Sequence, residues 1–267
     1  RLPNGIGALA QAASDHKLRF GIWIEPEMVN TNSELFEQHP DWVIRQPKRP
    51  LEFQRNQLVL DLTRPAVQEF EWKAIQGVFD VPGVSYVKWD CNRYLTQPGS
   101  SWLAPDRQSH LWIDYVRALY QLMDRTMKRY PQTELMLCSG GGGRVDSGAL
   151  KYFHEFWPSD NTDPVRRVTM QWDYSYFFPV TTLCSHVTRM GNRPMHFACT
   201  VAMSARFGNG SNDARTVLGR AATIFLGEGG VAGRGHRDLV HQRPPKRKSG
   251  LAPHMALGTS DCQGAAG

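Results

Sequence analysis

The sequence has few cysteines and no long apolar run, and each shortage excludes a class of protein. The five cysteines among 267 residues are odd in number and show no CxxC spacing, which argues against a disulfide framework or a zinc ribbon. They favour a reducing compartment. No apolar run approaches the ~18 residues that a membrane span needs, and no signal-peptide pattern opens the chain. We therefore expect a cytoplasmic protein with no membrane partner.

The chain also lacks the motifs of common cofactor sites. CSGGGGR at 138–144 follows an apolar run, as a phosphate loop would, but it has neither the lysine nor the Ser/Thr of a Walker motif. No GxGxxG pattern with a following acid indicates a dinucleotide, and no His, Asp or Glu spacing resembles a metal site. We expect neither a metal nor a cofactor. The glycines would instead let backbone N–H groups approach a compact ligand.

The net charge of +6 belongs to the end of the chain. Residues 205–267 hold nine Lys/Arg against four Asp/Glu, whereas the other 204 residues hold 22 against 21 and are nearly neutral. The basic run 243–248 has no interleaved aromatic residues, so we expect no nucleic-acid partner. Residues 208–267 contain 12 of the 24 glycines and are predicted to form an irregular, disordered basic tail.

Strands and helices are predicted to alternate over residues 1–207. An apolar content of 41% fits a folded protein with a large core. Helical spacing of apolar residues predicts helices at 3–17, 65–79 and 109–130. The predicted apolar face of the last one comprises Leu111, Trp112, Tyr115, Val116, Leu119, Leu122 and Met123. Apolar runs predict strands at 18–25, 57–62, 84–89, 133–139 and 151–160, and segments 177–184 and 193–203 complete the ordered part.

Several polar or aromatic residues lie where the predicted strands end, namely Trp23, Asp90, Cys138 and Asp160. A (β/α) barrel places its chemistry at the carboxyl ends of its strands. We therefore predict an α/β fold in which residues 1–207 form a (β/α)8 TIM-type barrel. About six inward strands can be counted where closure needs eight. We interpret the barrel as incomplete, with its early strands preceding Arg1 in a longer protein.

The segment VSYVKWDCNRY at 84–94 is an apolar run that ends abruptly in charge. Side chains alternate between the faces of a strand, so Lys88, Asp90 and Asn92 share one side while Trp89 points away. A lysine on the same face favours the ionised acid and lowers its pKa. The Asp90 carboxylate could then act as a nucleophile, although a buried ion pair at the strand terminus is an equal alternative.

A second carboxylate, Asp160, follows the aromatic residues Phe156 and Trp157. Against an apolar wall the charged form would be disfavoured, which would raise the pKa and suit a general acid. Asp163 has a simpler explanation, because Pro164 and an apparent helix follow it. We therefore assign Asp163 to the helix N-cap and Asp160 to the chemistry.

An ionised carboxylate and a carboxyl whose ionisation is disfavoured form the asymmetric pair that glycoside cleavage requires. Glu25 and Glu27 also end a strand, but Pro26 between them forces a bend, so each is a weaker catalytic candidate. His154 is interpreted as a core histidine rather than a ligand. Tryptophans at strand ends could stack on the apolar face of a sugar, although burial is their more common role.

Four segments, FGIWIEPEMVN, YVKWDCNRY, LCSGGGGR and WPSDNTD, occur in this order and resemble the microbial α-galactosidases of glycoside hydrolase family 36. The resemblance runs from about Pro3 to Phe207. It implies a retaining barrel enzyme that removes terminal α-galactose from melibiose, raffinose and related oligosaccharides without a metal. By matching motif positions it implies Asp90 as nucleophile and Asp160 as acid/base. The implied galactose subsite consists of Trp23, Arg55, Lys88, Asn92, Cys138, Gly141 and Trp157.

The sequence departs from this family at both ends. Members carry a preceding β-sandwich and early barrel strands, one of which brings an Asp-Asp pair that grips galactose hydroxyls. After Arg206 the family pattern is broken, and a shifted reading frame near Gly208 would explain the change. Full-length relatives are expected to be homo-oligomers, and we expect the exposed edges of an open barrel to make this chain fold poorly by itself. The alternatives are a related α-glycosidase or transglycosylase of the same clan, or an inactive carbohydrate-binding fragment.

Overall fold

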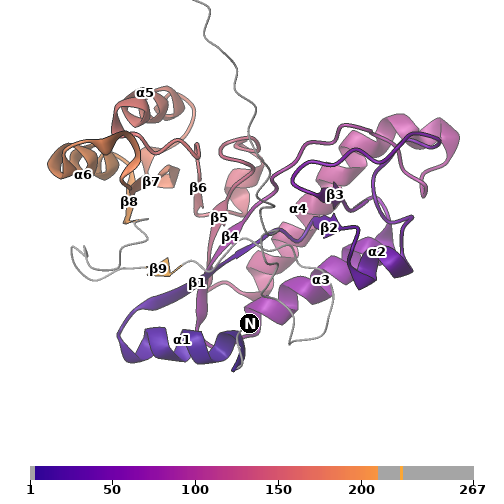
Figure 1. The fold of residues 1–267 in the computed structure, drawn as a ribbon, viewed down its shortest axis with the longest axis horizontal. Coiled ribbons are helices and arrows are strands. Elements are labelled where there is room, and N and C mark those ends of the chain that lie inside the picture. The colour runs from indigo at the N-terminus through magenta and orange to yellow at the C-terminus, as the bar shows by residue number, and fades with distance from the viewer. Residues whose placement is uncertain (1–3, 210–222, 225–267) are drawn as a thin grey trace, which may run out of the picture.

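A parallel sheet forms the centre of the fold. The computed structural model describes residues 4–209 and 223–224, so the predicted tail lies almost wholly outside the described residues (Figure 1). The sheet has the strand order β6-β5-β4-β1-β9, and each neighbouring pair is parallel. Its strands are β1 (Arg19–Ile24), β4 (Val84–Trp89), β5 (Glu134–Leu137), β6 (Glu155–Phe156) and β9 (Thr223–Ile224).

A second parallel pair continues the sheet. A parallel bridge between Phe156 and Leu183 leads from β6 to β7 (Cys184–Val187), which pairs with β8 (Arg206–Asn209). The carboxyl ends of these strands therefore meet along one edge, as predicted. The described residues form an α/β fold with a parallel sheet but do not close a barrel, so the eight-stranded closure stays a prediction.

Helices cover the outer side of the strands. They are α1 (Gly5–Asp15), α3 (Pro65–Phe79), α4 (Leu111–Arg129), α5 (Pro164–Ser175) and α6 (Met195–Met203). Figure 1 shows α3 and α4 along the central strands, and α5 and α6 beside β7 and β8. The main core lies between β4 and the helices α3 and α4, where Val87, Trp89, Ile75 and Leu122 are buried. The predicted helices at 65–79 and 109–130 are confirmed.

Three predictions about these elements are correct only in part. The strand predicted at 57–62 is limited to β3 (Gln57–Val59). It pairs antiparallel with β2 (Met28–Asn30) outside the main sheet, and α2 (Glu34–Gln38) lies between these two strands in the sequence. The strand at 151–160 is limited to β6, because a 3₁₀ turn occupies Ala149–Lys151 and Pro158 lacks an N–H for the ladder. Trp112 and Val116 of α4 are exposed, because the face that packs on the core is a narrower stripe than the apolar residues suggest.

Two further observations concern the chain as a whole. No described helix is long and apolar enough to cross a membrane. The four cysteines in the described ranges are free thiols: Cys91, Cys138, Cys184 and Cys199.

Candidate active site

Asp90 follows β4 directly and is held by three N–H donors. It is 3% exposed. Its Oδ1 accepts from the backbone N–H groups of Cys91, at 2.8 Å, and Gly140, at 3.3 Å. Its Oδ2 accepts from the indole Nε1 of Trp23 on β1, at 2.9 Å. The carboxylate is therefore fixed in orientation by two neighbouring strands and by the loop at 138–144 that follows β5, which we call the glycine loop.

The surroundings of Asp90 explain why its pKa lies below its ordinary value. Burial by itself would raise the pKa of this carboxyl, because it disfavours the charged form. The indole of Trp23, the Asn92 side chain, the charge of Lys88 and the Cys138 side chain all oppose that effect and outweigh it. The lowered pKa predicted from the sequence is confirmed, but hydrogen bonds contribute to it as well as Lys88.

The glycine loop after β5 contacts the carboxylate of Asp90 and the backbone at Asp160. Gly140 donates its N–H to Asp90, whereas Gly141 packs against the backbone of Ser159 and Asp160. A Cβ atom on Gly141 would lie 3.0 Å from the Ser159 Cα and 3.5 Å from the Asp160 N. Two segments seventy residues apart in sequence are thus brought to the same loop. This loop places Asp90 and Asp160 in one region of the fold.

Asp160 lies in the segment after β6, and its environment differs from the predicted one. The residue is exposed, and its Oδ1 accepts a hydrogen bond from the indole Nε1 of Trp157 at 2.8 Å. The predicted apolar wall is therefore wrong, because the indole presents its polar N–H to the carboxylate. The assignment of Asp163 is confirmed: it caps α5 by accepting from the Val165 N–H at 3.1 Å, with Pro164 in the first turn.

The other predicted site residues fall into two groups. Lys88 and Trp157 lie together, with the Lys88 Nζ 5.0 Å from the indole ring centroid. Asn92 instead bonds to Glu25, which it contacts through its backbone N–H, at 3.0 Å, and its side-chain amide. Arg55 is exposed and acts on Glu25 through its charge. Trp23, Cys138, Lys88 and Trp157 therefore lie around the two aspartates, and Asn92 connects Glu25 to Asp90.

Glu25 is a third carboxyl beside Asp90. It is 1% exposed, and its Oε2 accepts from the Gln57 side chain at 2.9 Å. Burial raises the pKa of Glu25 and the charge of Asp90 adds to this, while the bonds from Gln57 and Asn92 and the charge of Arg55 oppose it. The end of β1 lies beside the end of β4, which brings Glu25 next to Asp90.

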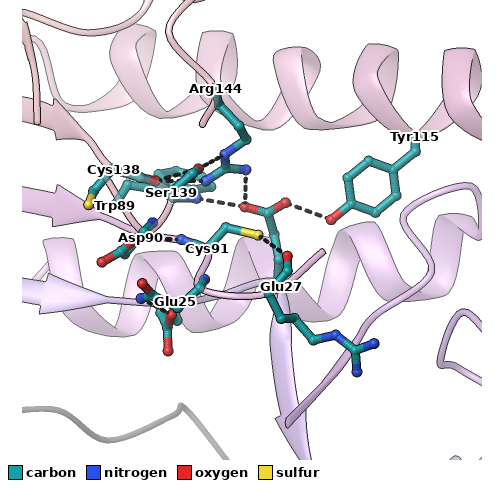
Figure 2. A network of polar contacts seen from close by, with 12 residues as sticks. Glu25, Glu27, Trp89, Asp90, Cys91, Tyr115, Cys138, Ser139 and Arg144 are labelled. Atoms are coloured by element: carbon teal, nitrogen blue, oxygen red, sulfur yellow. Dashed lines mark hydrogen bonds and ion pairs between the residues drawn. The ribbon is translucent and has the colours of Figure 1, made fainter. Parts of the chain in front are cut away.

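Next to the site, the buried Glu27 forms an ion pair with Arg144, whose side chain is 22% exposed (Figure 2). Glu27 is 0% exposed, and its Oε1 accepts from Arg144 at 2.8 Å and from the Trp89 indole at 3.1 Å. Its Oε2 accepts from the Tyr115 hydroxyl at 2.6 Å. Arg144 also donates to the Ser139 hydroxyl and to the Cys138 carbonyl. This network, which the sequence reasoning missed, ties the glycine loop to β1, β4 and α4.

Replacing Gly141 by alanine should displace the loop. Gly141 has φ +99°, a region that disfavours L side chains, and its new Cβ would meet the Ser159 backbone, which cannot move as a flexible side chain could. We expect a loss of about 1–3 kcal/mol in unfolding free energy, measured by urea denaturation. The matched control is Gly77→Ala in α3, where a Cβ meets nothing within 4 Å and should be stabilising. Equal stability of the Gly141 variant and the parent would contradict this account.

Known proteins resemble this chain over most of its length. A family profile described as Melibiase matches residues 1–217. Alpha-galactosidase AgaA of Geobacillus stearothermophilus is 42% identical over 214 residues, which are 78% of this chain and 29% of AgaA. Alpha-galactosidase 2 of Pediococcus pentosaceus is 42% identical over 192 residues, covering 72% of this chain and 27% of that protein.

Solved structures resemble the described fold. The crystal structure of the Geobacillus enzyme, a member of glycoside hydrolase family 36, matches with a TM-score of 0.77 at 40% identity, over 80% of this chain and 31% of that one. The α-galactosidase of Lactobacillus brevis matches with a TM-score of 0.78 at 35% identity, over 81% and 30% of the two chains. The chain thus spans less than a third of the length of these relatives.

Proposed function

The chain belongs to the Melibiase family, the α-galactosidases of glycoside hydrolase family 36, and we propose that it forms the catalytic centre of a retaining enzyme. The substrates would be terminal α-galactosides of the melibiose and raffinose type. Crystal structures of Geobacillus AgaA variants contain raffinose and stachyose. Each of those two variants replaces an aspartate, and the two positions are 70 residues apart. Asp90 and Asp160 have the same separation, which supports their assignment as the reacting pair.

In the proposed reaction Asp90 attacks the anomeric carbon of galactose. The bond to the departing oxygen breaks, and Asp160 gives its proton to that oxygen, leaving a galactosyl ester on Asp90. Asp160, now a carboxylate, takes a proton from water as the water oxygen attacks the same carbon and releases Asp90. The three N–H donors to Asp90 suit a nucleophile that must be charged, and the exposure of Asp160 suits a group that meets the leaving group.

The observation that carries this proposal is the glycine loop, which contacts Asp90 through Gly140 and the Asp160 segment through Gly141. Around it, we propose a galactose subsite lined by Trp23, Arg55, Lys88, Asn92, Cys138, Gly141 and Trp157. Glu25 is buried with both oxygens hydrogen-bonded, so we assign it a supporting role beside Asn92 rather than proton transfer to a leaving group.

The test is hydrolysis of a chromogenic α-galactoside by this chain and by a version extended at its N-terminus with the segment that the relatives carry. Hydrolysis by either form supports the proposal. Faster turnover of an α-N-acetylgalactosaminide, or galactosyl transfer to sucrose in preference to hydrolysis, would identify a different specificity within the clan. Galactose binding without turnover in both forms would contradict the proposal and identify a carbohydrate-binding fragment.

Replacing Trp23 by phenylalanine should raise the pH at which activity begins. The variant loses the indole N–H that lowers the Asp90 pKa, so the nucleophile stays protonated to a higher pH. A hydrogen bond to a charged group contributes ~1.5–3 kcal/mol, and one pKa unit corresponds to ~1.4 kcal/mol. The acid limb of the kcat/KM profile should therefore move up by about one to two pH units. An unshifted acid limb would show that the Trp23 bond does not control this ionisation.

A further inference from the structure

Arg167, in the first turns of α5, is a buried cation whose three nitrogens all bond to backbone carbonyls. The residue is 1% exposed. Its Nη2 donates to the Ser159 carbonyl at 2.7 Å and its Nε to the Asn161 carbonyl at 2.8 Å. Its Nη1 donates to the carbonyl of Cys184 on β7 at 3.1 Å. The guanidinium therefore grips the residues immediately before and after Asp160 and ties them to the next strand.

Arg167 also packs on the side chain that Asp160 contacts. Its Cζ lies 4.7 Å from the centroid of the Trp157 ring, within the range of a cation–π interaction. His186 on β7 lies against the same ring, with centroids 4.7 Å apart. The indole N–H of Trp157 is the donor to Asp160. One buried side chain thus constrains Asp160 through the backbone on both sides and through its hydrogen-bond partner.

We propose that Arg167 is a positioning residue for the acid/base Asp160, holding its carboxyl where it can exchange a proton with the leaving-group oxygen. This inference rests on the proposed function. A guanidinium offers donors in a fixed planar fork, so it can bond to two carbonyls separated by one residue. A lysine presents a single nitrogen and cannot reproduce that fork. Among the hydrogen bonds described for the exposed Asp160 side chain, the bond from the Trp157 indole is the only direct restraint.

The consequence is an effect that depends on the leaving group. A p-nitrophenolate leaves without being protonated, whereas the sugar oxygen of raffinose needs its proton during bond cleavage. Misplacement of an acid by ~1 Å can cost on the order of 100-fold in rate. Arg167→Lys should therefore lower kcat/KM on raffinose about 10- to 100-fold and leave kcat/KM on p-nitrophenyl α-galactoside within about threefold.

The control is Arg144→Lys, which alters a second arginine, 22% exposed, on the nucleophile side of the site. Arg144 bonds to Glu27, Ser139 and Cys138 and so acts on the loop that contacts Asp90. Because both substrates need the nucleophile in the first step, Arg144→Lys should lower kcat/KM on both by similar factors. The measurement uses whichever form hydrolyses the aryl galactoside, the chain itself or its N-terminally extended version.

If Arg167→Lys lowers kcat/KM on both substrates by similar factors, as expected for Arg144→Lys, the inference is overturned and Arg167 is a structural residue. If no form of the parent hydrolyses either substrate, the proposed function fails, which is a separate result. A second comparison protects against a folding defect. In an Asp160→Ala background Arg167→Lys should have no further effect on raffinose kcat/KM, because there is no carboxyl left to position; an additional 10-fold loss there would also overturn the inference.

Discussion

Replacing Asp90 by asparagine should abolish α-galactoside hydrolysis. The amide cannot form the galactosyl ester, and nucleophile removal in other covalent enzymes costs up to about 10⁶-fold in kcat. We expect kcat on p-nitrophenyl α-galactoside to fall at least about 10⁴-fold in the form that is active. The effect should hold for activated and natural substrates alike, because both pass through the same covalent step. Initial-rate measurements at saturating substrate provide the value.

An aspartate outside the site is the control for this substitution. Asp124 lies on α4, is half-exposed and pairs with Lys128 one helical turn away. Asp124→Asn should retain kcat within about twofold, since such helix pairs contribute only ~0.3–0.5 kcal/mol to stability. Activity of Asp90→Asn within tenfold of the parent would rule out Asp90 as the nucleophile, and the carboxyl of Glu25 beside it would be the next candidate.

Replacing Arg144 by methionine should cause a large loss of folding stability. The change leaves the Glu27 carboxylate 0% exposed and without its counter-charge, although the bonds from Trp89 and Tyr115 remain. Breaking a buried ion pair by removing one partner typically costs ~3–5 kcal/mol. A whole domain is stable by only ~5–15 kcal/mol, so the variant should lose a substantial fraction of its stability. Urea unfolding followed by tryptophan fluorescence measures this loss.

Two comparisons isolate the buried charge as the cause. Glu69 and Arg125 form the same type of pair at a similar distance, 2.7 Å against 2.8 Å, but with side chains 59% and 46% exposed. Arg125→Met should cost no more than about 1 kcal/mol. The double variant Glu27→Gln with Arg144→Met removes both charges and should recover part of the single-variant loss. If the stability losses of Glu27→Gln and Arg144→Met simply add in the double variant, the two residues are not coupled.

Local sequence pattern predicts the structure correctly where neighbouring residues determine it. The Asp163-Pro164 pair predicted a capped helix because an N-cap depends only on adjacent residues. The position of Asp90 at the end of a buried strand was predicted because an apolar run broken by charge marks both the strand and its exit. Parallel strands bring their carboxyl ends to one edge, so the gathering of Trp23, Asp90 and Cys138 followed. The roles of these residues in catalysis stay predictions.

Local pattern does not predict a residue's role where that role depends on partners distant in sequence. Arg144 and Arg167 have the appearance of surface charges, and nothing adjacent indicates that Glu27 or a set of backbone carbonyls will surround them. The apolar wall expected for Asp160 was wrong because the sequence shows that an indole is near but not which edge it presents. Trp112 was assigned to the core because helical periodicity does not reveal how wide a face the sheet covers.

The contact of one loop with both aspartates has a consequence for engineering. Gly140 bonds to Asp90 and Gly141 lies against the Asp160 segment, so in the proposed mechanism a substitution that shifts this turn should perturb formation and breakdown of the galactosyl ester together. Variants that build oligosaccharides instead of degrading them need the two half-reactions tuned separately. Mutant libraries for synthesis should therefore keep 138–144 constant.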